Sequence, residues 1–263
     1  MSKRIVITGA AGGIGSATVA LLRARGAQVV GLDLAGSDLE CDVRDQASVD
    51  RAVAAAIEQL GGLDVLINNA GIGTTQSAGR APDESALATV DVNMLGPWRV
   101  TSAAIGALRE SRGRVVNVAS GLSHMSIPLA TAYCMTKRGV VAYSDALRIE
   151  HGDAISVTTV YPGYIRTPIH DASNEDGFAL EGVVPAESLR SAARTLTRAA
   201  LGKRTARDLA TTRRAGVQYA FLSRIPGGVV DRAIRGRLRR LARKGHFERS
   251  QVARDFVRRL TAN

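Results

Sequence analysis

Short runs of aliphatic and β-branched residues alternate along the chain with longer amphipathic stretches rich in Ala and Leu. The short runs predict β-strands at residues 4–8, 28–33, 64–67, 114–119 and 155–161. The stretches between them predict helices, so the pattern indicates a series of βαβ units. Residues 115–118 are almost continuously hydrophobic, which is typical of a strand covered on both faces. We therefore predict an α/β fold with a doubly wound, mostly parallel sheet and right-handed crossovers.

Length and composition favour one such domain. The chain has 263 residues, of which 45% are hydrophobic, and this is sufficient for one sizeable core. We expect one domain over residues 1–202 and an extension over 203–263 that packs on or beside it. No apolar run is long enough to span a membrane and no signal peptide is evident, so we expect a cytoplasmic protein. Cys41 and Cys134 belong to no Cys/His cluster, and neither a disulfide framework nor a metal site is indicated.

The positive charge is concentrated in the extension. The chain has a net charge of +11, whereas residues 203–263 hold 17 Lys and Arg against 4 Asp and Glu, which leaves −2 for residues 1–202. The extension predicts a strand at 208–212 and helices at 216–223, 229–244 and 250–261.

The helix expected over residues 229–244 is basic and amphipathic. One face carries Val230, Ile234, Leu238 and Leu241, and its arginines lie mostly opposite. The apolar face would pack on the body or on a second subunit, or the helix would contact an anionic membrane at the periphery. Nucleic acid is the least favoured partner.

A glycine-rich segment directly follows the first strand. It reads Thr8-Gly9-Ala10-Ala11-Gly12-Gly13-Ile14-Gly15, and residues 16–25 have a helical pattern. Glycines permit a tight turn close to a pyrophosphate, and the N-terminus of the next helix offers free N–H groups and partial positive charge. The segment predicts a phosphate cradle, with a ligand-free glycine-rich turn as the alternative.

An acidic residue ends the second strand. Asp33 lies eighteen residues after Gly15, close to the spacing at which a carboxylate binds the adenosine ribose. A 2′-phosphate about 4 Å from this carboxylate would cost up to ~4 kcal/mol at an effective dielectric of 20. We therefore expect NAD rather than NADP, although Asp33 could instead cap a turn.

These residues resemble the short-chain dehydrogenase/reductase family. The phosphate loop has the family's spacing at Thr8, Gly9, Gly13 and Gly15, and further matches follow in the family's order. They are Asn68-Asn69-Ala70-Gly71, Asn93, Ser120 thirteen residues before Tyr133, Tyr133-Cys134-Met135-Thr136-Lys137, and Pro162-Gly163 with Thr167. The resemblance covers roughly residues 4–200. It implies a Rossmann fold, a homo-oligomer and hydride transfer between NAD(H) and a secondary alcohol or ketone.

By resemblance, the catalytic residues are Asn93, Ser120, Tyr133 and Lys137. The side chains of Tyr133 and Lys137 share one helix face at i, i+4, so the ammonium is expected to lower the pKa of the phenol by about two units. Tyr133 would act as the acid/base and Ser120 would bind the substrate oxygen. Asn93 would help to hold a water that links the lysine to solvent.

The resemblance also implies the contacts with the cofactor. We expect these at Gly9, Gly13, Ile14, Gly15, Asp33, Asp42, Val43, Asn69, Ala70, Gly71, Tyr133, Lys137, Pro162, Gly163, Ile165 and Thr167. Asn117 lies within a strand and is expected to be structural, whereas His124 could touch substrate or have no function.

Residues 166–189 take the place of the family's substrate lid. Apolar residues in this segment, Ile169, Phe178, Leu180, Val183 and Val184, allow an apolar pocket without naming its ligand. An extension that contacts a membrane would suit a hydrophobic substrate such as a steroid, retinoid or lipid. Two alternatives stay open: an NADPH-dependent carbonyl reductase, and a non-catalytic dinucleotide-binding regulator whose tail contacts membrane or nucleic acid.

Overall fold

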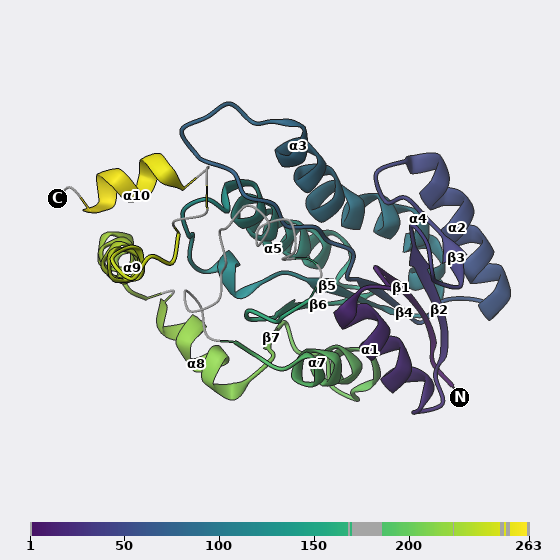
Figure 1. The fold of residues 1–263 in the computed structure, drawn as a ribbon. Helices are drawn as coiled ribbons and strands as arrows, with labels where there is room; N and C mark the ends of the chain where they lie inside the picture. Colours follow the sequence, from purple (N-terminus) through teal and green to yellow (C-terminus); the bar gives the residue numbers. More distant parts are fainter. Residues whose placement is uncertain are drawn as a thin grey trace.

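The computed structural model describes residues 2–167, 169, 186–222, 224–247, 250 and 253–261. These residues form a seven-stranded, wholly parallel sheet in the order β3-β2-β1-β4-β5-β6-β7 (Figure 1). The strands are β1 (Arg4–Thr8), β2 (Gln28–Asp33), β3 (Leu39–Glu40), β4 (Val65–Asn68), β5 (Arg114–Val118), β6 (Ser156–Tyr161) and β7 (Asp208–Ala210). The strand order reverses between β1 and β4, which places the ligand crevice of such a sheet at their carboxyl ends. The predicted doubly wound α/β fold is confirmed.

Helices cover both faces of the sheet. One face packs against α1 (Gly13–Arg23) and α7 (Leu189–Leu201), and the other packs against α2 (Gln46–Leu60), α4 (Gly96–Glu110) and α5 (Thr131–His151). A helix α3 (Glu84–Val90) runs into a π-helical turn, η1 (Asp91–Leu95), that leads into α4. The central strands β1, β4 and β5 are buried between the two helical layers. This burial explains their nearly continuous hydrophobic sequences.

Local signals fix the ends of several helices. Asp45 caps α2 by accepting hydrogen bonds from the backbone N–H groups of Ala47 and Ser48, and Gly61 ends the helix in the left-handed region at φ 65°. Ser188 caps α7 by accepting from the N–H of Ser191 at 3.1 Å. Both caps hold helices that pack directly on the sheet.

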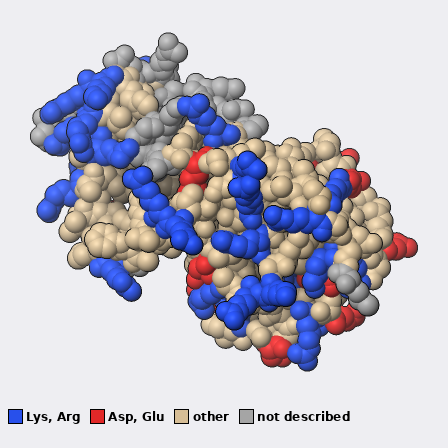
Figure 2. Space-filling model, turned by 90° about the horizontal axis from the view of Figure 1, so that it is seen from below, with Lys and Arg blue, Asp and Glu red and all other residues tan. Residues whose placement is uncertain are grey.

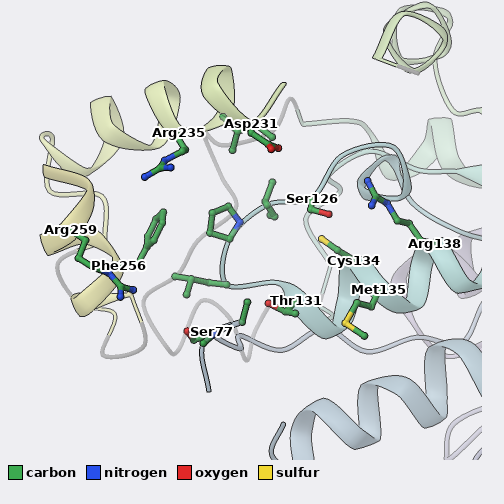
Figure 3. A pocket seen from close by; sticks show the side chains of 16 residues that line it. Ser77, Ser126, Thr131, Cys134, Met135, Arg138, Asp231, Arg235, Phe256 and Arg259 are labelled. Carbon is green, nitrogen blue, oxygen red and sulfur yellow. Dashed lines mark hydrogen bonds between the residues drawn. The ribbon is translucent and has the colours of Figure 1, made fainter. Parts of the chain in front are cut away.

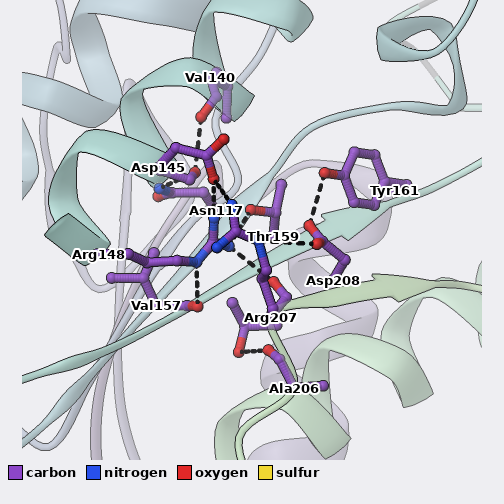
Figure 4. A network of polar contacts seen from close by, with 12 residues as sticks. Asn117, Val140, Asp145, Arg148, Val157, Thr159, Tyr161, Ala206, Arg207 and Asp208 are labelled. Atoms are coloured by element: carbon purple, nitrogen blue, oxygen red, sulfur yellow. Dashed lines mark hydrogen bonds and ion pairs between the residues drawn. The ribbon is translucent and has the colours of Figure 1, made fainter. Parts of the chain in front are cut away.

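The first part of the extension belongs to the sheet. Strand β7 pairs with β6 and forms one edge of the sheet. A polar network holds this edge: Asp145 on α5 forms ion pairs with Arg148 at 2.5 Å and Arg207 at 2.6 Å (Figure 4). The Tyr161 hydroxyl donates to Asp208 at 2.8 Å. Residues 207 and 208 are therefore tied to the catalytic part of the chain.

Three helices follow: α8 (Arg213–Leu222), α9 (Gly227–Ala242) and α10 (Arg254–Thr261). The apolar face of α9 packs against α10, with Leu238, Phe247 and Leu260 gathered around Leu129 of the body. This arrangement agrees with the predicted packing of the apolar stripe on the body. Figure 2 shows Lys and Arg side chains over most of this face, whereas the Asp and Glu side chains that it shows lie away from the end that carries α9 and α10. Within the described part of the chain, no helix combines the length and apolarity needed to cross a bilayer.

Candidate active site

The glycine-rich turn between β1 and α1 is built for close backbone contact. Gly9 has φ +65°, and a Cβ there would lie 2.8 Å from the Cα of Ala70. A Cβ on Gly15 would overlap the carbonyl oxygen of Gly9. Among the described residues, no side chain caps the N-terminus of α1, whose N-cap is Gly12, so the first-turn N–H groups are left for a ligand. The turn fits the pyrophosphate of a dinucleotide.

The loop after β4 supports this turn. The side-chain amide of Asn69 donates to the carbonyl oxygens of Thr8 at 3.1 Å and Gly9 at 3.0 Å. In return, the Thr8 hydroxyl accepts from the N–H groups of Asn69 and Ala70, both at 3.1 Å. The residues predicted from the Thr-Gly and Asn-Asn-Ala-Gly motifs therefore form one hydrogen-bonded unit.

The carboxylate at the end of β2 faces the same turn. Asp33 accepts hydrogen bonds from the N–H groups of Ala11 at 2.9 Å and Leu34 at 2.8 Å. The sequence left open whether Asp33 binds a ribose or caps a turn. The structure shows that its carboxylate stabilises a turn and also lies beside the glycine-rich loop. Asp42 is turned toward Arg44 in an ion pair at 2.7 Å, and Val43 packs against Gly96. The roles of Asp42 and Val43 at an adenine stay predictions.

Three candidate catalytic side chains come together between β5 and α5. Ser120 lies two residues after the end of β5, and its hydroxyl accepts from the N–H of Leu122 at 3.2 Å. Tyr133 and Lys137 lie one turn apart on α5, with the ammonium 5.7 Å from the centre of the phenol ring. Lys137 is only 4% exposed and donates to the carbonyl oxygen of Val118 at 3.0 Å.

The expected lowering of the Tyr133 pKa is wrong. Burial raises the pKa of Tyr133 to about 12, and hydrogen bonding with Ser120 opposes this rise only in part. Burial also lowers the pKa of Lys137 to about 8. Spacing on the helix predicted the proximity of the two groups, but desolvation of both outweighs their attraction.

Asn93 lies in the π-helical turn η1 and is fully buried. Its side chain accepts from the N–H of Ile72 and donates to the carbonyl oxygen of the same residue, both at 2.8 Å. A Cβ on Gly71 would lie 3.3 Å from Asn93 Oδ1 and 3.5 Å from Lys137 Nζ. Asn93 therefore anchors the backbone loop that passes beside the lysine. Extra turns of this kind are frequent at functional sites.

A cavity of about 810 Å³ joins the two halves of the site. It is lined by ten of the predicted residues: Ile14, Asn69, Gly71, Ser120, Tyr133, Lys137, Pro162, Gly163, Ile165 and Thr167. The sequence analysis missed other walls, including Leu122 and Met125 after β5 and several residues of α8 and α9. Among these is Tyr219, whose hydroxyl packs against the backbone at Gly121, beside Ser120.

Two further predictions concern residues outside this cavity lining. Asn117 is fully buried, accepts from Asn68 at 2.8 Å and donates to Ser144 at 2.9 Å, which confirms a structural residue. His124 lies between the rings of Tyr161 and Tyr219, with centroids at 4.6 and 4.8 Å. Burial lowers the pKa of His124.

Most of the predicted lid, residues 168 and 170–185, lies outside the described residues.

The sheet and its glycine-rich turn define a nucleotide-binding protein with a Rossmann fold. The family described as short chain dehydrogenase matches residues 3–177, and the chain belongs to this family of oxidoreductases. It is 33% identical over 189 residues to the oxidoreductase UcpA of Escherichia coli, covering 65% of this chain and 72% of that protein.

Solved structures agree with this assignment. A 3-ketoacyl-(acyl-carrier-protein) reductase from Brucella melitensis, complexed with NADH, has a TM-score of 0.70 at 27% identity, over 79% of this chain and 96% of that one. A short chain dehydrogenase from Burkholderia cenocepacia, in complex with NADP, has a TM-score of 0.71 at 25% identity, over 84% and 94%.

Proposed function

We propose that the protein transfers a hydride between NAD(H) and a secondary alcohol or ketone of hydrophobic character. The observation that carries this proposal is that Ser120, Tyr133 and Lys137 line the same cavity as Ile14, from the turn that fits a pyrophosphate. The solved relatives with NADH or NADP support a nicotinamide dinucleotide as the cofactor. The carboxylate of Asp33 beside the turn favours NAD, because it would repel a 2′-phosphate.

The side chains divide the proton chemistry between them. The nicotinamide, when bound, supplies or accepts the hydride. Tyr133 gives its proton to the substrate oxygen during reduction and recovers it during oxidation. Its raised pKa keeps the phenol protonated and ready to donate. The Ser120 hydroxyl donates a hydrogen bond to the same oxygen, and the Lys137 charge stabilises the phenolate that remains.

We predict that the protein binds NADH at least about tenfold more tightly than NADPH. Asp33→Asn keeps a side-chain oxygen that can accept from Ala11 but removes the charge, so it is expected to reduce this preference severalfold. Titrations that follow reduced-nicotinamide fluorescence measure both constants. Glu40→Ala removes an exposed carboxylate on the neighbouring strand and serves as the control. Tighter binding of NADPH by the unmodified protein would contradict the role of Asp33.

The two rival functions differ in what they predict for the same protein. An NADPH-dependent carbonyl reductase would bind NADPH more tightly and turn over ketones. A non-catalytic regulator would bind a dinucleotide and reduce no carbonyl compound, with or without Tyr133. The binding titration and a turnover assay together therefore separate the three functions.

We also propose peripheral contact between the extension and an anionic membrane. Val217 and Phe221, one turn apart on α8, are 73% and 65% exposed, and exposed arginines 213 and 224 flank them. Apolar side chains beside cations suit the interface of an anionic bilayer.

Flotation with vesicles of phosphatidylglycerol and phosphatidylcholine at low salt is expected to carry the protein upward. Val217→Ser with Phe221→Ser is expected to abolish flotation. Leu87→Ser, at an exposed site on α3, is the control and is expected to leave flotation intact. Failure of the unmodified protein to float would contradict membrane contact.

The expected assembly of the protein into a homo-oligomer stays a prediction.

A further inference from the structure

The catalytic cavity extends to the C-terminal helices, beyond the segment matched by the family. Helix α8 contributes Ala215, Gln218, Tyr219 and Leu222 to its lining, and α9 contributes Val229, Val230, Ala233, Ile234, Arg237 and Arg240. The matched segment ends at residue 177. These walls lie outside the segment that the family model matches, and they bear on the substrate that the cavity accepts.

The stripe of α9 that faces the cavity changes from apolar to positively charged along the helix. Its first part presents Val230, Ala233 and Ile234, and its last part presents Arg237 and Arg240. Arg214, at the start of α8, lines the same cavity. Other charged residues of α9 face elsewhere. Arg235, for example, lines a second cavity of about 560 Å³ between α5, α9 and α10 (Figure 3).

The charges around the catalytic cavity do not balance. Its described lining holds the cations Lys137, Arg214, Arg237 and Arg240 and the carboxylate of Glu187. Neutral donors satisfy that carboxylate: the N–H of Gly163 at 2.9 Å and the hydroxyls of Thr211 and Thr212. Within the part of the chain that the structure describes, neither Arg214 nor Arg240 forms an ion pair. Among the described groups, an anion entering the cavity would meet Arg214 and Arg240 without displacing a carboxylate.

We propose that Arg214 and Arg240, which line the same cavity, form a subsite for an anionic group on the substrate. The inference rests on the proposed function, since the carbonyl of the same molecule lies at Ser120 and Tyr133. The substrate is then an amphiphile, with a ketone or secondary alcohol at one end and a carboxylate or phosphate at the other. The apolar part of the α9 stripe contacts the chain between them. Guanidinium groups bind both anions through charge-assisted hydrogen bonds.

Two matched pairs of ketones test the subsite and distinguish its anion. Oxodecanoate and its methyl ester differ in a carboxylate, whereas acetoacetyl-coenzyme A and acetoacetyl-N-acetylcysteamine differ in the phosphate-bearing carrier. We expect KM for the charged member of at least one pair to be lower. In Arg214→Ala with Arg240→Ala, the ratio of the charged KM to the uncharged KM is expected to rise about tenfold or more. The pair that responds identifies the anion.

Arg232→Ala with Arg243→Ala is the control, because it removes the same charge from exposed positions outside the described cavity lining. Its KM ratios are expected to stay unchanged. Turnover of both pairs with unchanged ratios in the cavity variant would overturn the anion subsite but not the proposed function. A rise in the NADH dissociation constant of that variant would also overturn it, because the arginines would then serve the cofactor. No turnover of any ketone by the unmodified protein would overturn the proposed function itself.

Discussion

Tyr133→Phe is expected to reduce turnover by between about 100-fold and 10,000-fold, because it removes the proton donor and leaves the ring in place. The ring of Tyr133 contributes to a small apolar cluster near Cys134, which phenylalanine preserves. We therefore expect the midpoint of thermal unfolding and the NADH dissociation constant to change little. Steady-state kinetics measure the loss, and fluorescence titration measures cofactor binding.

The matched control is Tyr143→Phe, the same substitution on the same helix. Tyr143 packs against Trp98, with ring centroids 5.8 Å apart, and is not part of the described cavity lining. Its loss of a hydroxyl is expected to leave turnover nearly unchanged. Comparable turnover in Tyr133→Phe and the unmodified protein would remove Tyr133 from the chemistry.

The second large effect concerns Lys137, where we expect activity and stability to change in opposite directions. Burial lowers the pKa of this lysine from its usual 10.5 to about 8, so the lysine is mostly charged at pH 7 but its buried charge destabilises the folded state. This corresponds to about 3 kcal/mol. Lys137→Met removes that cost but also the hydrogen bond to the carbonyl of Val118. We expect a net gain of about 2 kcal/mol in the free energy of unfolding at pH 7, with turnover largely lost.

The pH dependence of the free energy of unfolding tests the direction of this effect. Between about pH 8 and the pKa of an unfolded lysine, the unfolded chain binds a proton that the folded chain does not, so the unmodified protein becomes more stable as pH rises. The advantage of Lys137→Met should therefore shrink over this range. Denaturant unfolding at pH 7 and pH 10 measures it. Lys203→Met, at an exposed site, is the control. If Lys137→Met were less stable than the unmodified protein at pH 7, the interactions of Lys137 in the folded state would outweigh the cost of burying the ammonium. This would contradict the prediction.

Most of the sheet could be predicted because each long strand is buried on both faces and reads as a hydrophobic run. Strand β3 was missed, since Leu39–Glu40 is too short to show any periodicity. Its two residues pair with the end of β2, next to Asp33. The position of α10 was also shifted: it begins at Arg254 rather than at residue 250.

The candidate site was predictable where chemistry is local in sequence. The glycine turn and the proximity of Tyr133 and Lys137 follow from spacing, whereas Ser120 was expected from the resemblance to the family. The walls contributed by α8 and α9 did not follow, because an amphipathic stripe shows that a face is buried but not what covers it. Val230 and Ile234 were assigned to the apolar stripe, yet they line the catalytic cavity. The predicted lowering of the Tyr133 pKa was wrong for a related reason, because tertiary packing sets how deeply a side chain is buried.

The most direct test of the account is the fate of a deuterium label carried on the reactive carbon of reduced nicotinamide. The protein is mixed with the ketones described above and with NADH that carries deuterium at both hydrogen positions of this carbon, and the alcohol products are examined by mass spectrometry. We expect deuterium on the carbinol carbon, with little product from Tyr133→Phe. NADH binding without label in any product would contradict hydride transfer.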